Sequence, residues 1–125
     1  IVHKRSAYVR PHKHLNKSEA VHIIEGEAVG IIFDENGNII NVIKMADYRS
    51  GNIFYYRMSE PLYHTLLIHS EILIFHEITN GPFNRKDTVF APWAPDENDI
   101  FAQKKFLEHL SQEVNIFLAP CEKHF

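Results

Sequence analysis

The feature of this sequence that most restricts its fold is a series of short apolar runs separated by turn residues. Runs of about four to eight residues are the usual length of β-strands. The Asn36-Gly37 pair between two of the runs is typical of a tight β-hairpin turn. We therefore predict an all-β domain, either a sandwich or a small barrel. The runs are SAYVRPH, AVHIIEG, AVGIIFD, IINVIKM, NIFYYRM, HTLLIH and EILIFHEIT.

Helical periodicity is found only near the end of the chain. Asp96 is the predicted N-cap, because acidic residues suit the positive end of the helix dipole. We expect residues 1–95 to form the β-domain, including the loop FAPWAP, and residues 96–125 to form a helix and tail packed on it. The apolar residues near one helical stripe are Ile100, Leu107, Leu110, Val114 and Phe117.

Size and composition exclude several classes of function. A chain of 125 residues with 45% hydrophobic residues is long enough for one core. A net charge of -3 with interspersed signs gives no surface for nucleic acid or an anionic membrane. Cys121 is the single cysteine, and no apolar run reaches the roughly 20 residues of a membrane span. We expect a cytoplasmic protein whose partner is a small molecule, not nucleic acid or a membrane.

The segment YVRPHKH contains two histidines at alternate positions. Residues two apart in a strand point to the same face, so His12 and His14 share a face, together with Tyr8 and Arg10. Pro11 has no N–H group for a β-ladder, which predicts an edge strand, a strand start or an irregular segment there. The predicted interior therefore receives two imidazoles.

The next run adds a carboxylate to the two imidazoles. Glu19 follows a connection short enough for a tight return, and His22 falls on the opposite face of its strand. Two imidazoles and one carboxylate suit zinc, iron, manganese, nickel or copper. His64, which opens HTLLIH after a proline turn, is the best candidate for a third imidazole. If His64 instead points away, a metal-free barrel remains the alternative.

These motifs carry a family resemblance. HKHLNKSEAVHIIEG has the spacing of the first cupin motif, and PLYHTLLI resembles the second. Together with YVRPHKH, FYYR, NGPF and FAPWAP, they resemble the WbuC-type cupin fold metalloproteins, which are associated with bacterial surface-polysaccharide gene clusters. The similarity runs from about residue 6 to about residue 99. It implies an antiparallel double-stranded β-helix, that is, a cupin or jelly-roll barrel, and a homodimer. It also implies one divalent ion (Fe, Mn, Zn or Ni) held by His12, His14, Glu19 and His64.

Other polar residues are candidates for binding a substrate beside the metal. Tyr8 and Arg10 are predicted to face the interior, where Arg10 would hold a carboxylate or phosphate. The alternative for Arg10 is a structural ion pair with Glu77. Tyr56 and Arg57 raise the same possibility from another strand, and which of them points inward is open.

Two further residues have candidate roles in chemistry. Glu77 and Tyr56 are candidates for handling protons, and His76 for orienting a ligand imidazole, its alternative being a solvated outer-face histidine. The expected function is a metal-dependent enzyme acting on a small polar or anionic metabolite, related to sugars if the resemblance holds. The alternative is a non-catalytic metal-containing module that binds or senses a small ligand.

Overall fold

The computed structural model describes residues 1–82 and 84–122, with the side chains of 120–122 excepted. Phe83 of the NGPF turn, the side chain of Cys121 and the tail 123–125 thus lie outside the described residues. Two short 3-10 helices, Tyr48–Ser50 and Arg85–Asp87, interrupt the strands. The other elements are β1 (Val2–Lys4), β2 (His12–His14), β3 (Glu19–Glu25), β4 (Glu27–Phe33), β5 (Ile39–Ala46), β6 (Tyr55–Met58), β7 (Tyr63–Ile68), β8 (Ile72–Thr79), β9 (Thr88–Phe90) and α1 (Ile100–Glu122).

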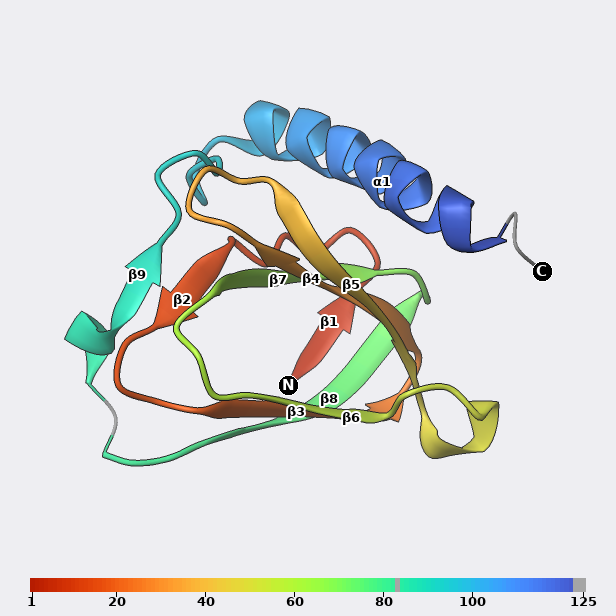
Figure 1. Ribbon diagram of the computed structural model, residues 1–125, viewed down its shortest axis with the longest axis horizontal. Helices are drawn as coiled ribbons and strands as arrows, with labels where there is room; N and C mark the ends of the chain where they lie inside the picture. Colours follow the sequence, from red (N-terminus) through yellow and green to blue (C-terminus); the bar gives the residue numbers. More distant parts are fainter. Residues whose placement is uncertain (83, 123–125) are drawn as a thin grey trace.

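The described strands form two antiparallel sheets. One has the order β1-β8-β3-β6 and the other the order β5-β4-β7-β2-β9. The sheets lie face to face, and α1 runs across the outer side of the five-stranded sheet (Figure 1). The prediction of a β-domain followed by one C-terminal helix is confirmed at this level.

Strand β4 is buried on both faces, which explains its almost continuous apolar sequence. Val29, Ile31 and Phe33 contact the layer that contains α1, whereas Ala28 and Ile32 pack between the two sheets. A strand that is covered on both sides loses the alternation of apolar and polar residues. Hence β4 lies in the middle layer of a three-layer arrangement of sheet, sheet and helix.

Helix α1 is held by a narrower apolar stripe than its sequence predicts. Leu110 and Val114 are each only 2% exposed and pack against the residues of β4 that face the helix. Ile100 and Phe117, which the periodicity places on the same stripe, are exposed. No helix within the described residues combines the length and apolarity needed to span a bilayer.

The N-terminus of α1 lies a few residues later than predicted. Asp99 precedes the first helical residue, and its carboxylate accepts a 3.0 Å hydrogen bond from the N–H of Ala102. Asp96 instead accepts a bond from Asn98 in the preceding turn. The predicted cap at Asp96 is therefore wrong, because the run DEND offers three capping side chains, Asp96, Asn98 and Asp99, and the chain uses the last.

The hairpin between β4 and β5 rests on Trp93 of the FAPWAP loop. The Trp93 ring lies 4.8 Å from that of Phe33, and its Nε1–H donates to the carbonyl oxygen of Glu35 at 3.1 Å. Gly37 has a φ of +89°, and a Cβ there would lie 2.9 Å from the Trp93 ring. Glycine is thus required both by the positive φ and by the lack of room for a side chain beside Trp93. Trp93 packs as a plug for this loop.

Candidate metal centre

The first three candidate ligands lie where the chain passes from one sheet to the other. Strand β2 belongs to the five-stranded sheet and begins directly after Pro11, one of the three possibilities predicted for this proline. Asn16, with a φ of 60°, turns the short connection back so that β3 starts at Glu19 in the four-stranded sheet. Asparagine is among the residues that tolerate this conformation. His14 and Glu19 consequently face each other between the sheets.

The fourth candidate ligand comes from β7, which is the neighbour of β2. Residues His12 and His64 are direct partners in the antiparallel register, and their rings lie 4.6 Å apart. One possible ligand atom from each of His12, His14, Glu19 and His64 lies within 4.8 Å of the other three. The structure therefore brings together the four residues singled out from the sequence, although it does not identify an ion.

Backbone carbonyl groups orient two of the imidazoles. Nδ1 of His12 lies 2.8 Å from the carbonyl oxygen of Arg10, and Nδ1 of His64 lies 2.9 Å from that of Leu62. A carbonyl only accepts hydrogen bonds, so each Nδ1 must carry the proton. In the neutral ring, Nε2 then has a free lone pair, which is the form that binds a metal.

The third imidazole, that of His14, is oriented by a side chain. Nδ1 of His14 lies 3.3 Å from the hydroxyl oxygen of Thr88, its direct partner on β9. Nε2 of His14 points at Glu19, 2.9 Å from its carboxylate. This is an ion-pair distance outside hydrogen-bond geometry, so the buried Nε2 has no hydrogen-bond partner among the residues that the structure describes. An orphaned nitrogen in a buried cluster indicates a missing partner.

Glu19 is 7% exposed, which is unusual for a carboxylate. Burial by itself raises its pKa, but close contacts with His14, His64 and Glu77 outweigh that effect and hold the pKa well below its ordinary value. The carboxylate is therefore ionised inside the protein. Its oxygen lies 2.8 Å from Nε2 of His64, so a lone pair and an anion face each other unless a proton or a cation lies between them.

These observations fit a divalent transition metal. Bonds of about 2.1 Å place neighbouring ligand atoms about 3 Å apart, close to the 2.8 and 2.9 Å separations of Glu19 from His64 and His14. Burial, followed by the charge of His64, lowers the pKa of His12 to about 4, which keeps this ring neutral and ready to bind. Three nitrogens and one carboxylate oxygen suit zinc, iron, manganese or nickel.

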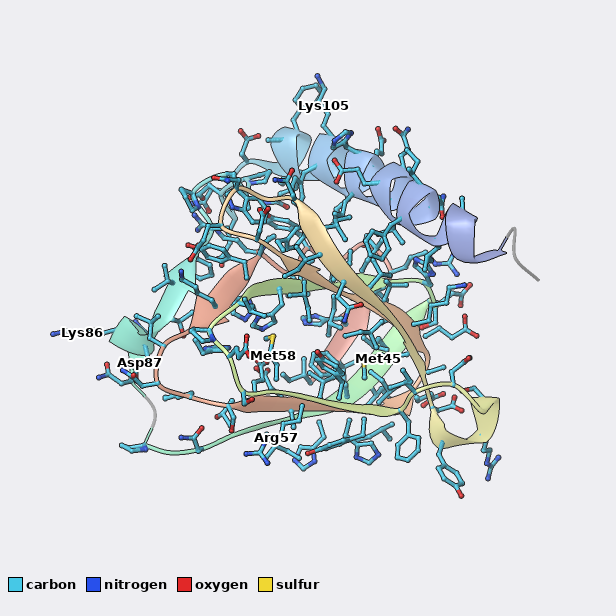
Figure 2. The ribbon with its side chains drawn as sticks, in the orientation of Figure 1. Met45, Arg57, Met58, Lys86, Asp87 and Lys105 are labelled. Carbon is cyan, nitrogen blue, oxygen red and sulfur yellow. The ribbon has the colours of Figure 1, made fainter. Side chains whose placement is uncertain are left out.

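The cluster forms part of the wall of a cavity of about 130 Å³ between the sheets. His12, Glu19 and His64 line it, and Tyr56 and Glu77 reach it from β6 and β8. Met58 and Met45 also line it, and both extend between the sheets in Figure 2. The other lining residues are Ile1, His3, Val9, Val21, Gly30, Ile31, Ile32, Ile43, Thr65, Leu66 and Phe75.

Glu77 is the second carboxyl group of the cavity. Its hydrogen bond with Glu19, burial and the negative charge of Glu19 together raise its pKa to about 8. One proton is thereby shared between two carboxyl groups, with Glu77 as its holder at neutral pH. Tyr56 lines the same cavity from β6, on the other side of β3, because Val21 of β3 pairs with Tyr56 on one side and with Glu77 on the other. The inward orientation of Glu77 and Tyr56 is what the candidate roles of these residues require.

The predicted position of Tyr8 beside the ligands is wrong. No strand is formed between residues 5 and 11, so the alternation that relates His12 to His14 does not extend back to Tyr8. Its hydroxyl donates a 2.8 Å hydrogen bond to the carbonyl oxygen of Pro95, and its ring contacts Phe106 of α1. Burial raises its pKa to about 12. Tyr8 thus anchors the loop and helix.

Arg10 is also absent from the cavity lining. Its guanidinium lies over the ring of Phe90, 4.3 Å from the centroid, and 3.7 Å from the carboxylate of Asp96. The alternative reading of a structural ion pair is the better one, but the partner is Asp96, not Glu77. The carbonyl group of Arg10, not its side chain, contacts the site through His12.

Two other candidates lie on the outer face of the four-stranded sheet. Tyr56 points inward, so Arg57 points outward, where it is exposed and donates a 3.3 Å hydrogen bond to Ser18 (Figure 2). Glu77 points inward, so His76 is exposed beside its register partner His22. Arg57 and His76 thus lie away from the cavity where their contacts with a substrate and with a ligand imidazole are predicted.

Sequence reasoning missed two residues of the site. His3 lines the cavity from β1, a strand that the short apolar runs do not include. Thr88, which orients His14, lies in β9, a strand that the short apolar runs do not include either. Neither residue carries a local signal, because its contact is set by strand pairing far along the chain.

Comparison with known proteins gives one match. A family model described as a domain of unknown function (DUF6016) matches residues 1–45, which include His12, His14 and Glu19 but not His64. Neither the curated proteins nor the solved structures contain a match.

Proposed function

We propose that this chain is a cupin-type barrel that binds one divalent transition metal and acts on a small molecule in the adjoining cavity. The strand order supports the barrel. Numbered along the chain, β1 to β8 divide into sheets of order 1-8-3-6 and 5-4-7-2, the arrangement expected for a jelly roll of two Greek keys. Strand β9 then extends one edge of that arrangement.

The observation that carries the function is the group of four ligand atoms within 4.8 Å at the cavity wall. A bound divalent ion supplies Lewis acidity to a ligand oxygen or lowers the pKa of water. The chain itself contributes His12, His14, Glu19 and His64 to hold the ion. Glu77, with its pKa of about 8, holds a proton at the cavity and can donate or accept it there.

Tyr56 offers the ligand a second polar contact, because its side chain lines the cavity from β6. The alternative, a metal-containing module that binds a ligand without changing it, shares the same geometry and differs only in whether a product forms. The expected homodimer stays a prediction.

Metal content tests the proposal. Zinc bound after loading and dialysis is measured for the unmodified chain, for His64→Gln and for His76→Gln, an exposed histidine on the outer face. We expect about one zinc per chain in the unmodified protein and in His76→Gln, and a large loss in His64→Gln. Circular dichroism verifies that each variant is folded. Equal zinc in both variants, or none in the unmodified protein, would contradict the proposal.

A further inference from the structure

The cavity beside the four candidate ligands is apolar except around them. Glu77, Glu19 and His64 form one connected group in its wall. The other polar residues of the lining are His3, His12, Tyr56 and Thr65. Away from this group, aliphatic and aromatic side chains from both sheets form the wall, and Figure 2 shows Met58 and Met45 among them. A ligand there has one polar end to satisfy and an apolar surface around the rest.

The charges of the lining do not suit an anionic ligand. Among the described residues that line this cavity there is no lysine or arginine, whereas two carboxyl groups, Glu19 and Glu77, are present. Arg10 is directed at Asp96, and Arg57 lies outside the sheet. Apart from the bound ion, a carboxylate or phosphate on the ligand would therefore meet the ionised Glu19 and no side-chain cation other than a protonated histidine.

The size of the cavity limits the ligand further. An engineered apolar cavity of roughly 150 Å³ holds one benzene molecule, so about 130 Å³ has room for about six to eight non-hydrogen atoms. Sugars carry a hydroxyl on nearly every carbon, and an apolar pocket discriminates against one added hydroxyl by about 100-fold. A polyhydroxylated molecule of the right size is thus a poor fit.

We propose, on the basis of the metal-binding function above, that the ligand is a neutral and largely apolar molecule with one oxygen-bearing group, of the size of cyclohexanol or phenol. Its oxygen faces His12, His64 and Glu77, and its hydrocarbon part contacts Met45, Met58 and the aliphatic wall. This ligand class differs from the polar or anionic metabolite that the sequence suggests.

Gly30 offers a way to fill the cavity without touching a candidate ligand. It lines the cavity from β4 and does not have a positive φ. A Cβ built there lies 3.8 Å from Ile43 and 3.9 Å from Sδ of Met45, which are ordinary van der Waals distances. A Cβ is therefore accepted at this position, and the methyl groups of a β-branched valine, a residue type that suits strands, would extend from it into ligand space.

The experiment is isothermal titration calorimetry on the zinc-loaded chain with three probes: cyclohexanol, erythritol and butyrate. We expect cyclohexanol to bind at least about 100-fold more tightly than erythritol, and more tightly than butyrate. Gly30→Val should lose cyclohexanol binding and keep its zinc, whereas the outer-face control Arg57→Gln should keep both. Zinc content is measured on the same samples.

The outcomes separate the two proposals. If the chain binds zinc but prefers erythritol or butyrate, or if Gly30→Val binds cyclohexanol as the unmodified chain does, the ligand class is wrong and the metal site stands. If the unmodified chain takes up no zinc, the proposed function itself is wrong.

Discussion

Thr88→Val tests whether the imidazoles are oriented for a metal by the hydrogen bonds described above. Thr88 is the side chain that holds Nδ1 of His14, whereas His12 and His64 are held by backbone carbonyl groups. Removing such an orienting partner typically lowers metal affinity about 10- to 100-fold. The distance of 3.3 Å is long for a hydrogen bond, so we expect about 10-fold, or about 1.4 kcal/mol.

The assay is competition for zinc against a fluorescent chelator at pH 7.5. Valine has nearly the shape of threonine, so the change removes the hydroxyl and little else. Thr79→Val is the matched control, because Thr79 lines a second, more polar cavity together with Thr88. An unchanged affinity in Thr88→Val, or an equal loss in Thr79→Val, would refute the orienting role of the hydroxyl.

Two further predictions concern stability. In the metal-free chain Glu77 has a pKa of about 8 instead of 4.5, so the folded state keeps a proton that the unfolded chain loses, and the free energy of unfolding should fall as pH rises between these values. Urea titrations at pH 5 and pH 8 should show a smaller fall in Glu77→Gln, and an identical fall would exclude Glu77 as the cause. Leu110→Ala should lower the free energy of unfolding by about 2–5 kcal/mol. Ile116→Ala, at an exposed position of the same helix, should lower it by less than about 1 kcal/mol. Equal losses in the two variants would contradict the packing of α1.

Strand alternation predicts the site correctly where the strand is regular. His12 and His14 lie within β2, and Glu19 and His22 within β3, so their relative orientations follow from the period of two. The same rule fails for Tyr8 and Arg10, because the chain before Pro11 forms no strand. Pro11 predicts a break in the strand, but the sequence does not tell whether the strand lies before or after this proline.

Alternation gives relative orientation but not which face is inside. In β8 the residues Ile72 to Phe75 are all apolar, so the sequence alone does not tell which of His76 and Glu77 points inward. The structure decides through Leu73 and Phe75, which are buried between the sheets and place Glu77 on their side. Packing between the sheets therefore determines which of the two residues points inward, and no local sequence pattern predicts it.

The fourth ligand depends on strand pairing between distant segments. His64 meets His12 because β7 and β2 are neighbours in register, 52 positions apart in numbering. Only the resemblance to a two-motif family suggests this pairing from the sequence. The ligand class was not predictable for a related reason, since the cavity wall is assembled from several strands whose inward faces are fixed only when both sheets close on each other.

X-ray absorption spectroscopy of the zinc-loaded chain tests the central claim most directly. Four protein ligands of this kind predict a first shell of nitrogen and oxygen at about 2.0–2.1 Å. The spectrum should also contain the outer-shell scattering of three imidazoles, and His64→Gln should lose one of them. A shell of oxygen alone, or a spectrum unchanged by His64→Gln, would contradict a metal centre built from His12, His14, Glu19 and His64.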